Sequence, residues 1–209
     1  MKKSVVMGDL DKIIQIASEL NKIVKIQTRK PLETVAIFDL SNSTDLKLKI
    51  GHDEAIRKIF FHNQLCRQII KRFNGHVVKD MGDGLLAKFQ DPLDACLAAI
   101  NIQIATQKCE IPSKAALALG VIEEATIDKN VDVYGSTVDL CSRMEKCALP
   151  NQILTDRSLF DVVKTHLKDY GDIIVGDVMH TDLKGFGRCE IYEISSEKLG
   201  LINSLKNSD

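Results

Sequence analysis

The sequence predicts an α/β sandwich in which helices pack on a mixed β-sheet. Three observations predict this class. β-Rich segments alternate with segments of helical periodicity, two β-rich segments flank a tight turn near the middle of the chain, and no internal repeat interrupts the pattern. With 209 residues, of which 44% are hydrophobic, the chain is long enough to bury a core without disulfide or metal staples.

The chain opens with an amphipathic helix over about residues 9–25, where apolar side chains recur at helical spacing. This helix is expected to pack on the core of its own domain, with contact to a second subunit as the alternative. Pro31 closes a short polar linker, because a proline disfavours helix immediately before it. The sequence is therefore divided into a helix and linker (1–32), a main domain (33–197) and a tail (198–209).

The main domain continues the alternation of strands and helices. Its first strand covers 34–40 and ends in the turn and helix-cap sequence SNST. The further elements are expected, in chain order, as a helix at 53–73, two strands within 76–89 around the Gly82-Asp83-Gly84 turn, a helix at 92–108, a fully buried strand at 114–122, a helix at 136–147, and strands at 152–155, 172–178 and 188–194.

Composition excludes several classes of protein. Twenty-eight basic and 29 acidic residues give a net charge of −1, whereas nucleic-acid and membrane-surface proteins usually show a basic excess. Apolar runs fall far short of the ~20 residues of a membrane span. The N-terminus lacks the pattern of a secretory signal, and the six cysteines show no metal-ligand spacing. We expect a cytoplasmic protein with reduced, mostly buried cysteines, no bound nucleic acid and no membrane insertion.

Two aspartates occupy positions where strands end. Asp39 closes a buried apolar strand, and Asp83 lies at the tip of the central hairpin. A carboxylate in such a place costs free energy unless it stays solvated or meets a cation. A solvated turn is the ordinary explanation for either residue alone. Together, facing each other across adjacent strands, the two carboxylates are what a pair of divalent ions about 3.5–4 Å apart requires.

The flanking sequences add phosphate-binding and charged groups. The small polar residues after Asp39 have backbone N–H groups that can wrap a triphosphate at a helix start. The further charged residues stand in recognisable local sequences: Lys79 in NGHVVKDMGDGLLAKF, Asp132, Asp139 and Arg143 in DVYGSTVDLCSRME, and Lys184 in LKGFGRCEIYEI. Asp139 and Arg143 are four residues apart, on one helix face. The five histidines, at 52, 62, 76, 166 and 180, stand singly and are expected to be structural or exposed.

These motifs, in this order, resemble the class III nucleotide cyclases over roughly residues 33–195. The resemblance implies a ferredoxin-like βααββαβ core and a head-to-tail homodimer with active sites at the subunit interface. It also implies a nucleoside triphosphate substrate and two divalent metal ions, Mn²⁺ or Mg²⁺. Cyclisation then proceeds by attack of the ribose 3′-oxygen on the α-phosphate, with pyrophosphate leaving.

The resemblance also implies roles for single residues. The expected assignments are Asp39, Asp83 and the Leu40 carbonyl as metal ligands, Lys79 and Asp132 as readers of the base edge, Lys184, Ser43 and Thr44 as binders of the phosphates, and Arg143 and Asp139 as catalytic residues at the α-phosphate and the ribose. Two departures from the family bear on substrate choice. Asp139 stands where asparagine is usual, and an ionised aspartate can only accept hydrogen bonds. The usual Gly-x-His-x-Gly segment is replaced by ALGVIEEA at 118–125.

The base remains open between two alternatives. A Lys–Asp pair is associated with adenine, and cytosine or a shifted uracil can meet the same donor and acceptor. The short stand-alone chain and Asp139 resemble the pyrimidine cyclases of antiphage (Pycsar) systems, which make cyclic UMP or CMP for a separate effector protein. We predict a pyrimidine cyclase narrowly over an adenylate cyclase. An inactive nucleotide-binding regulator is a third, weaker alternative. Guanylate and diguanylate cyclases are disfavoured, since their base-reading residues and Gly-Gly-Asp/Glu-Glu-Phe turn are absent.

Overall fold

The computed structural model describes residues 7–23, 27–127, 130–170 and 172–197. Within these ranges the elements are, in chain order, α1 (Met7–Ile23), β1 (Gln27–Arg29), β2 (Leu32–Leu40), α2 (Ser43–Ile50), α3 (His52–Arg72), β3 (His76–Asp80), β4 (Gly84–Phe89), α4 (Pro92–Lys108), β5 (Ser113–Val121), β6 (Glu123–Ile127), β7 (Asn130–Tyr134), α5 (Ser136–Cys147), β8 (Ile153–Asp156), α6 (Arg157–Asp169), β9 (Ile173–Leu183) and β10 (Gly187–Ser196). The predicted tail, 198–209, lies outside the described residues.

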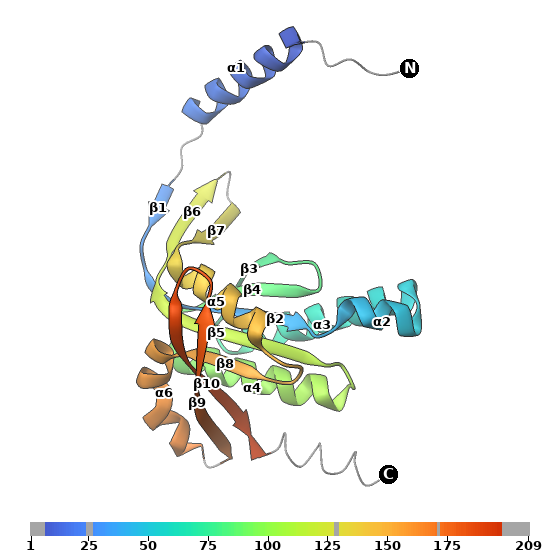
Figure 1. Cartoon of the computed structure of the whole chain (residues 1–209), viewed down its shortest axis with the longest axis vertical. Coiled ribbons are helices and arrows are strands. Elements are labelled where there is room, and N and C mark those ends of the chain that lie inside the picture. The colour runs from blue at the N-terminus through green and yellow to red at the C-terminus, as the bar shows by residue number, and fades with distance from the viewer. Residues whose placement is uncertain (1–6, 24–26, 128–129, 171, 198–209) are drawn as a thin grey trace.

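The main sheet has the strand order β3-β4-β2-β5-β8-β10-β9 (Figure 1). Its first four strands are antiparallel to their neighbours and, with α2, α3 and α4, build the expected βααββαβ core. β8 then joins β5 in parallel, and the β9–β10 hairpin extends that edge. The predicted α/β class and mixed sheet are therefore confirmed.

Both faces of the main sheet are covered, which explains why the middle of its central strands is apolar on both faces. On one face α3, α4 and α6 pack on Phe38, Ala87 and Leu117. On the other face α5 packs through Cys141 and Met144 on the alternate residues of the same strands. Successive side chains of a strand point to opposite faces. Whether a residue occupies an odd or an even position along β2, β4 or β5 therefore decides which layer of helices its side chain meets. This holds also for the polar residues at the strand ends.

The sequence prediction missed a smaller sheet of order β1-β6-β7. The polar segment taken as a linker before Pro31 contains β1, which pairs antiparallel with β6. The ALGVIEEA segment runs from the end of β5 into β6, and β6 pairs in turn with β7. β1 and β6 are short and partly polar, so neither shows the apolar signal of a buried strand. α2 and α6 were also not predicted as separate helices from residue pattern.

Two further expectations need correction. α1 stands apart from the main sheet in Figure 1, and its apolar side chains are exposed, with Ile13 62% and Ile14 59% accessible. The expectation that α1 packs on its own domain's core is therefore wrong for the described side chains, and contact with a second subunit stays a prediction. All six cysteines are free, as expected, but only three of them are buried. The expectation that most of the cysteines are buried is therefore not met. Among the described residues, no helix is long and apolar enough to cross a membrane.

Candidate active site

Asp39 and Asp83 lie side by side at the end of β2. Asp39 is in register with Gly84, and the Leu40 N–H donates to the Asp83 carbonyl over 3.3 Å. Gly84 makes this approach possible, because a Cβ at that position would lie 2.5 Å from the Phe38 carbonyl oxygen and 2.9 Å from Asp39 Oδ1. The sequence prediction that the two aspartates face each other across adjacent strands is consistent with this register.

The surroundings of Asp39 disfavour a negative charge. Burial, and then the neighbouring Asp83 and Glu145 carboxylates, raise the pKa of Asp39 to about 7. Lys114 acts in the opposite direction: its Nζ lies 3.7 Å from Asp39 Oδ2 and 2.7 Å from Glu145 Oε1. Lys114 thus pairs with two of the three acidic side chains, Asp39 and Glu145, and no ion pair to Asp83 is found among the described residues. Acidic groups therefore outnumber the cations that contact them in this corner of the molecule.

This donor set fits a divalent ion that arrives with a phosphate ligand. In the described part of the chain, no group of three or more His, Cys, Asp or Glu side chains could hold a metal ion by itself. Mg²⁺, however, is commonly bound by one or two carboxylates together with substrate phosphates and water. Asp39 and Asp83 would supply the carboxylates for such an ion, and a bound cation would offset their negative charge.

Lys79 and Asp132 come from different sheets and meet in an ion pair. Lys79 Nζ on β3 lies 2.8 Å from each carboxylate oxygen of Asp132 on β7, and 5.9 Å from the centre of the Tyr134 ring. Burial raises the pKa of Asp132, but the hydrogen bonds from Lys79 and the Val133 N–H outweigh burial, so the net pKa lies below its ordinary value. The predicted donor and acceptor are thus adjacent and oppositely charged.

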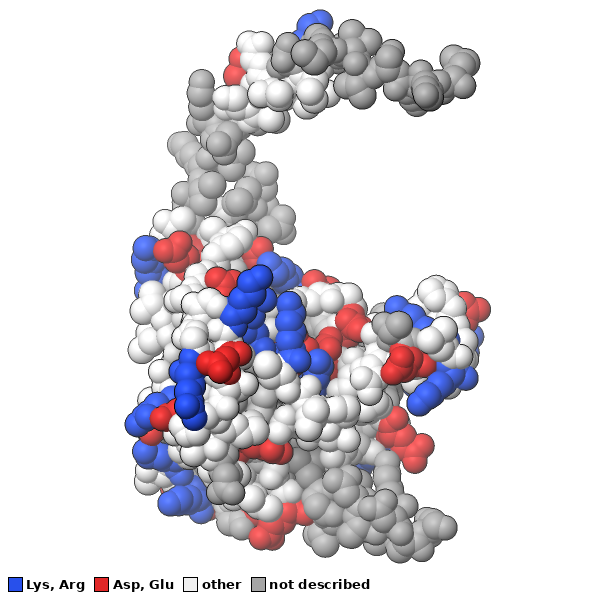
Figure 2. Space-filling view, viewed as in Figure 1, with Lys and Arg blue, Asp and Glu red and all other residues white. Residues whose placement is uncertain are grey.

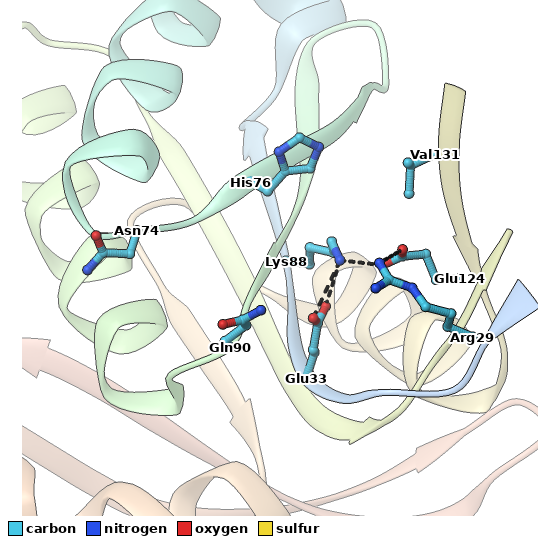
Figure 3. A pocket seen from close by; sticks show the side chains of 8 residues that line it. All are labelled: Arg29, Glu33, Asn74, His76, Lys88, Gln90, Glu124 and Val131. Atoms are coloured by element: carbon cyan, nitrogen blue, oxygen red, sulfur yellow. Dashed lines mark hydrogen bonds and ion pairs between the residues drawn. The ribbon is translucent and has the colours of Figure 1, made fainter. Parts of the chain in front are cut away.

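A charge cluster with buried carboxylates clamps the small sheet to the main sheet (Figure 3). Asp132 belongs to this small sheet, on β7. Lys88 of β4 reaches Glu33 of β2 over 3.1 Å and also pairs with Glu124 of β6, which Arg29 of β1 contacts from its other side. Both carboxylates are almost fully buried. The four side chains line a cavity of about 380 Å³, and their charges balance among themselves. Sequence reasoning missed this cluster because its members are far apart in the chain.

Asp139, Arg143 and Lys184 project from the α5 side of the sheet. Asp139 is exposed and Arg143 half-buried on α5, and Lys184 is exposed in the turn between β9 and β10. Within the described residues, neither cation has a hydrogen-bond or ion-pair partner in this chain, and no such contact joins these three to Asp39, Asp83, Lys79 or Asp132. Both basic side chains are therefore free to meet a ligand.

Ser43 and Thr44 form the first turn of α2, directly after the Asp39 strand. The preceding Asn42 is in the left-handed conformation, with φ 57°, and its side chain makes no capping hydrogen bond. The N–H groups of a first helical turn have no partner within the helix. They are thus available to an anion, and phosphate binding at Ser43 and Thr44 stays a prediction.

The fold is that of the class III nucleotide cyclase catalytic domain. It matches the adenylyl cyclase CyaB from P. aeruginosa with a TM-score of 0.68 and 19% identity, over 80% of this chain and 95% of that one. It matches the guanylate cyclase domain of RhGC from Catenaria anguillulae, solved in complex with GTP, with a TM-score of 0.70 and 19% identity, over 81% and 98% of the two chains.

Sequence comparison points the same way. A protein described as an adenylate cyclase, from Glutamicibacter nicotianae, is 25% identical over 171 residues. The aligned region is 80% of this chain and 40% of that protein, so the chain spans well under half of this curated relative. No family model matches the sequence.

The buried cluster yields a stability prediction. Lys88→Met leaves the Glu33 and Glu124 carboxylates buried without their shared cation, which typically costs about 3–5 kcal/mol. The same change at Lys164, whose pair with Asp161 is about half exposed, is expected to cost about 0–1 kcal/mol. Urea denaturation of both variants measures the difference. Equal, small losses would show that the cluster does not clamp the sheets.

A second prediction concerns Asp39. Because its pKa is raised to about 7, the folded protein binds this proton more tightly than the unfolded chain, and stability falls as pH rises from about 4 to about 7. Asp39→Asn is neutral throughout, so in EDTA at pH 8 the variant is expected to melt above the wild type, by about 2–4 °C per kcal/mol gained. The difference should shrink as pH falls towards 4. Asp182→Asn, at an exposed position, is the control and should leave the melting temperature unchanged.

Proposed function

We propose that this protein is a nucleotide cyclase, which converts a nucleoside triphosphate to its 3′,5′-cyclic monophosphate and pyrophosphate. The observation that carries the proposal is the Asp39–Asp83 pair at adjacent strand ends of a class III cyclase fold. Fold alone does not define activity. The pair indicates a chemistry, which the fold by itself does not. It concentrates negative charge suited to the cations that accompany a triphosphate.

In the proposed reaction the ribose 3′-oxygen forms a bond to the α-phosphorus, and the bond from that phosphorus to the bridging oxygen of pyrophosphate breaks. Asp39, Asp83 and the Leu40 carbonyl would hold two divalent ions, Mg²⁺ or Mn²⁺, which supply Lewis-acid charge to the hydroxyl and the triphosphate. The proton of the 3′-hydroxyl leaves to solvent or to a phosphate oxygen.

The remaining residues bind and stabilise the triphosphate. Arg143 is proposed to face the α-phosphate, where a guanidinium stabilises the charge that builds up in the transition state. Lys184 and the first turn of α2, at Ser43 and Thr44, are proposed to hold the outer phosphates. Asp139 is proposed to accept a hydrogen bond from the ribose.

We infer that the working unit is a head-to-tail homodimer. Support comes from the separation of the groups within one chain: no direct contact among described residues joins Arg143 or Lys184 to the two aspartates. In a twofold dimer, the aspartates of one subunit would face the cations and the Lys79–Asp132 pair of the other, giving two equivalent sites.

ATP is the first candidate substrate. Lys79 can donate to a ring nitrogen of adenine, and Asp132 can accept from its exocyclic amine; the relative from Glutamicibacter nicotianae is described as an adenylate cyclase. A pyrimidine triphosphate, UTP or CTP, is the second candidate and rests on Asp139 in place of asparagine. A catalytically inactive regulator is less well supported, since every charged group of the proposed site is present.

The biological setting is proposed on the same basis. The cyclic nucleotide would act in the cytoplasm as a second messenger, read by a separate effector protein. A role in antiphage defence belongs to the pyrimidine candidate alone and depends on that product being found.

Subunit mixing tests the shared site. Asp39→Ala and Arg143→Ala are each expected to lower turnover by a factor of about 10²–10³ or more, because each removes a group that acts on the transition state. In a dimer with shared sites, a freely exchanging 1:1 mixture should recover about a quarter of wild-type activity, since half the dimers regain one of two sites. The formation of mixed dimers is verified with two affinity tags. If these mixed dimers stay inactive, the whole site lies within one chain.

Incubation with ATP, GTP, CTP and UTP in turn, with Mn²⁺ or Mg²⁺ and products resolved by mass, tests the base. We expect cyclic AMP. Asp132→Ala leaves a polar edge unpaired and should cost about 1–3 kcal/mol, or five- to over a hundred-fold, while levelling the preference among the four. Asp139→Asn is the matched variant and should change turnover for all four nucleotides together. Cyclic UMP or CMP as the main product would establish the second candidate, and no product from any nucleotide would refute the cyclase proposal.

A further inference from the structure

A buried polar network on α3 lies against the Asp39–Asp83 pair, outside the roles described so far. His62 is fully buried. Its Nδ1 lies 3.1 Å from the Asn63 side-chain oxygen, and its Nε2 lies 2.9 Å from Ser113 Oγ on β5. Buried polar groups are expensive unless each is satisfied, so a chain of three in the interior calls for an explanation.

The hydrogen bonds assign the protons of this network. Asn63 Nδ2 donates to the Gly82 carbonyl over 3.3 Å, which turns the amide oxygen towards His62. An oxygen only accepts, so His62 Nδ1 carries the proton and Nε2 is an acceptor. Ser113 has a single hydroxyl hydrogen, which is shared between two acceptors, His62 Nε2 at 2.9 Å and the Asp39 carbonyl oxygen at 3.3 Å. Burial lowers the pKa of His62, in agreement with a neutral ring.

The two ends of the network reach the two aspartates from one side of the sheet. Asn63 holds the carbonyl of Gly82, the residue before Asp83. Ser113 Oγ lies 3.3 Å from the backbone carbonyl of Asp39. Ser113 shares a face of β5 with Ala115 and Leu117, which is the face that α3 and α4 cover. A single helix therefore contacts both strand ends.

Something must hold these strand ends, because the register of β2 and β4 brings two acidic residues together there, and like charges repel. Gly82 has φ +84° and nothing within 4 Å of where a Cβ would be, so this residue adds no side-chain packing that would restrain the turn. Backbone bonds restrain these ends in part: Met81 N–H donates to the Gly84 carbonyl (2.9 Å), Leu40 N–H to the Asp83 carbonyl (3.3 Å) and Ser41 N–H to the Pro112 carbonyl (2.8 Å). The pairing of β2 with β5 also extends to Leu40.

We propose that His62, Asn63 and Ser113 are positioning residues that set the separation and orientation of the Asp39 and Asp83 carboxylates. The metal-binding part of this inference rests on the proposed function; the restraint on the two strand ends does not. Residues that orient metal ligands through hydrogen bonds commonly change metal affinity or activity by about 10–100-fold when removed. None of the three is expected to touch substrate or metal.

The test uses Asn63→Ala and Ser113→Ala, each of which cuts one arm of the network. Thr106→Val is the matched control, since it also deletes a fully buried hydroxyl, one that bonds only within α4. Amide hydrogen exchange of the metal-free protein is measured over 38–41 and 81–84. Binding of Mn²⁺ alone is measured by electron paramagnetic resonance, with melting temperature as a check on folding.

We expect Asn63→Ala to speed exchange mainly at 81–84, and Ser113→Ala mainly at 38–41. Both should weaken Mn²⁺ binding about 10–100-fold, while Thr106→Val changes neither. If Asn63→Ala and Ser113→Ala fold but exchange at the two segments no faster than Thr106→Val, the inference is overturned. The three residues would then serve only to fill the core. Local loosening in a protein that cyclises no nucleotide would refute the proposed function and support this inference.

Discussion

Repulsion between the Asp39 and Asp83 carboxylates is the constraint around which this end of the molecule is organised. Register between β2 and β4 brings the two strand ends together, and Gly84 lets them approach more closely than a side chain would permit. Burial disfavours the charged form of Asp39, and repulsion from the Asp83 and Glu145 carboxylates adds to this effect, so the pKa of Asp39 rises to about 7. The free protein therefore holds an electrostatic strain that a divalent cation would relieve.

Alternation along the strands supports this corner from both faces of the sheet. Lys114 points to the α5 face and meets the Asp39 carboxylate and Glu145, whereas its neighbour Ser113 points to the α3 face and meets the Asp39 backbone. One face thus adjusts the charge of the site and the other its geometry. Consecutive residues of β5 divide these two tasks.

Much of the fold was predictable because its central elements carry strong local signals. The helix at 92–108 was predicted with its observed bounds, since Pro92 marks its start. The structure adds Asp91 as its N-cap. β1, β6 and the Lys88 cluster were not predicted, because their polar residues are stabilised by partners far away in the chain. Asp39 and Asp83 stand out in the sequence, but Lys114, Glu145 and His62 do not. Their roles depend on strand parity and on helix packing that a linear pattern does not contain.

The small sheet, which sequence analysis did not predict, affects how Lys79 and Asp132, the proposed base-reading residues, would respond to a ligand. Asp132 sits on β7, tied to the main sheet through its pair with Lys79 and, by way of β6, through Glu124 and Lys88. The first tie is about a third to a half exposed, and the second is buried. A base that inserts between Lys79 and Asp132 would exchange one set of hydrogen bonds for another while the buried cluster keeps β7 in place. Selectivity would then depend on how well the base edge replaces an ion pair already formed in the free protein, so a base that satisfies only one partner leaves the other charge unpaired.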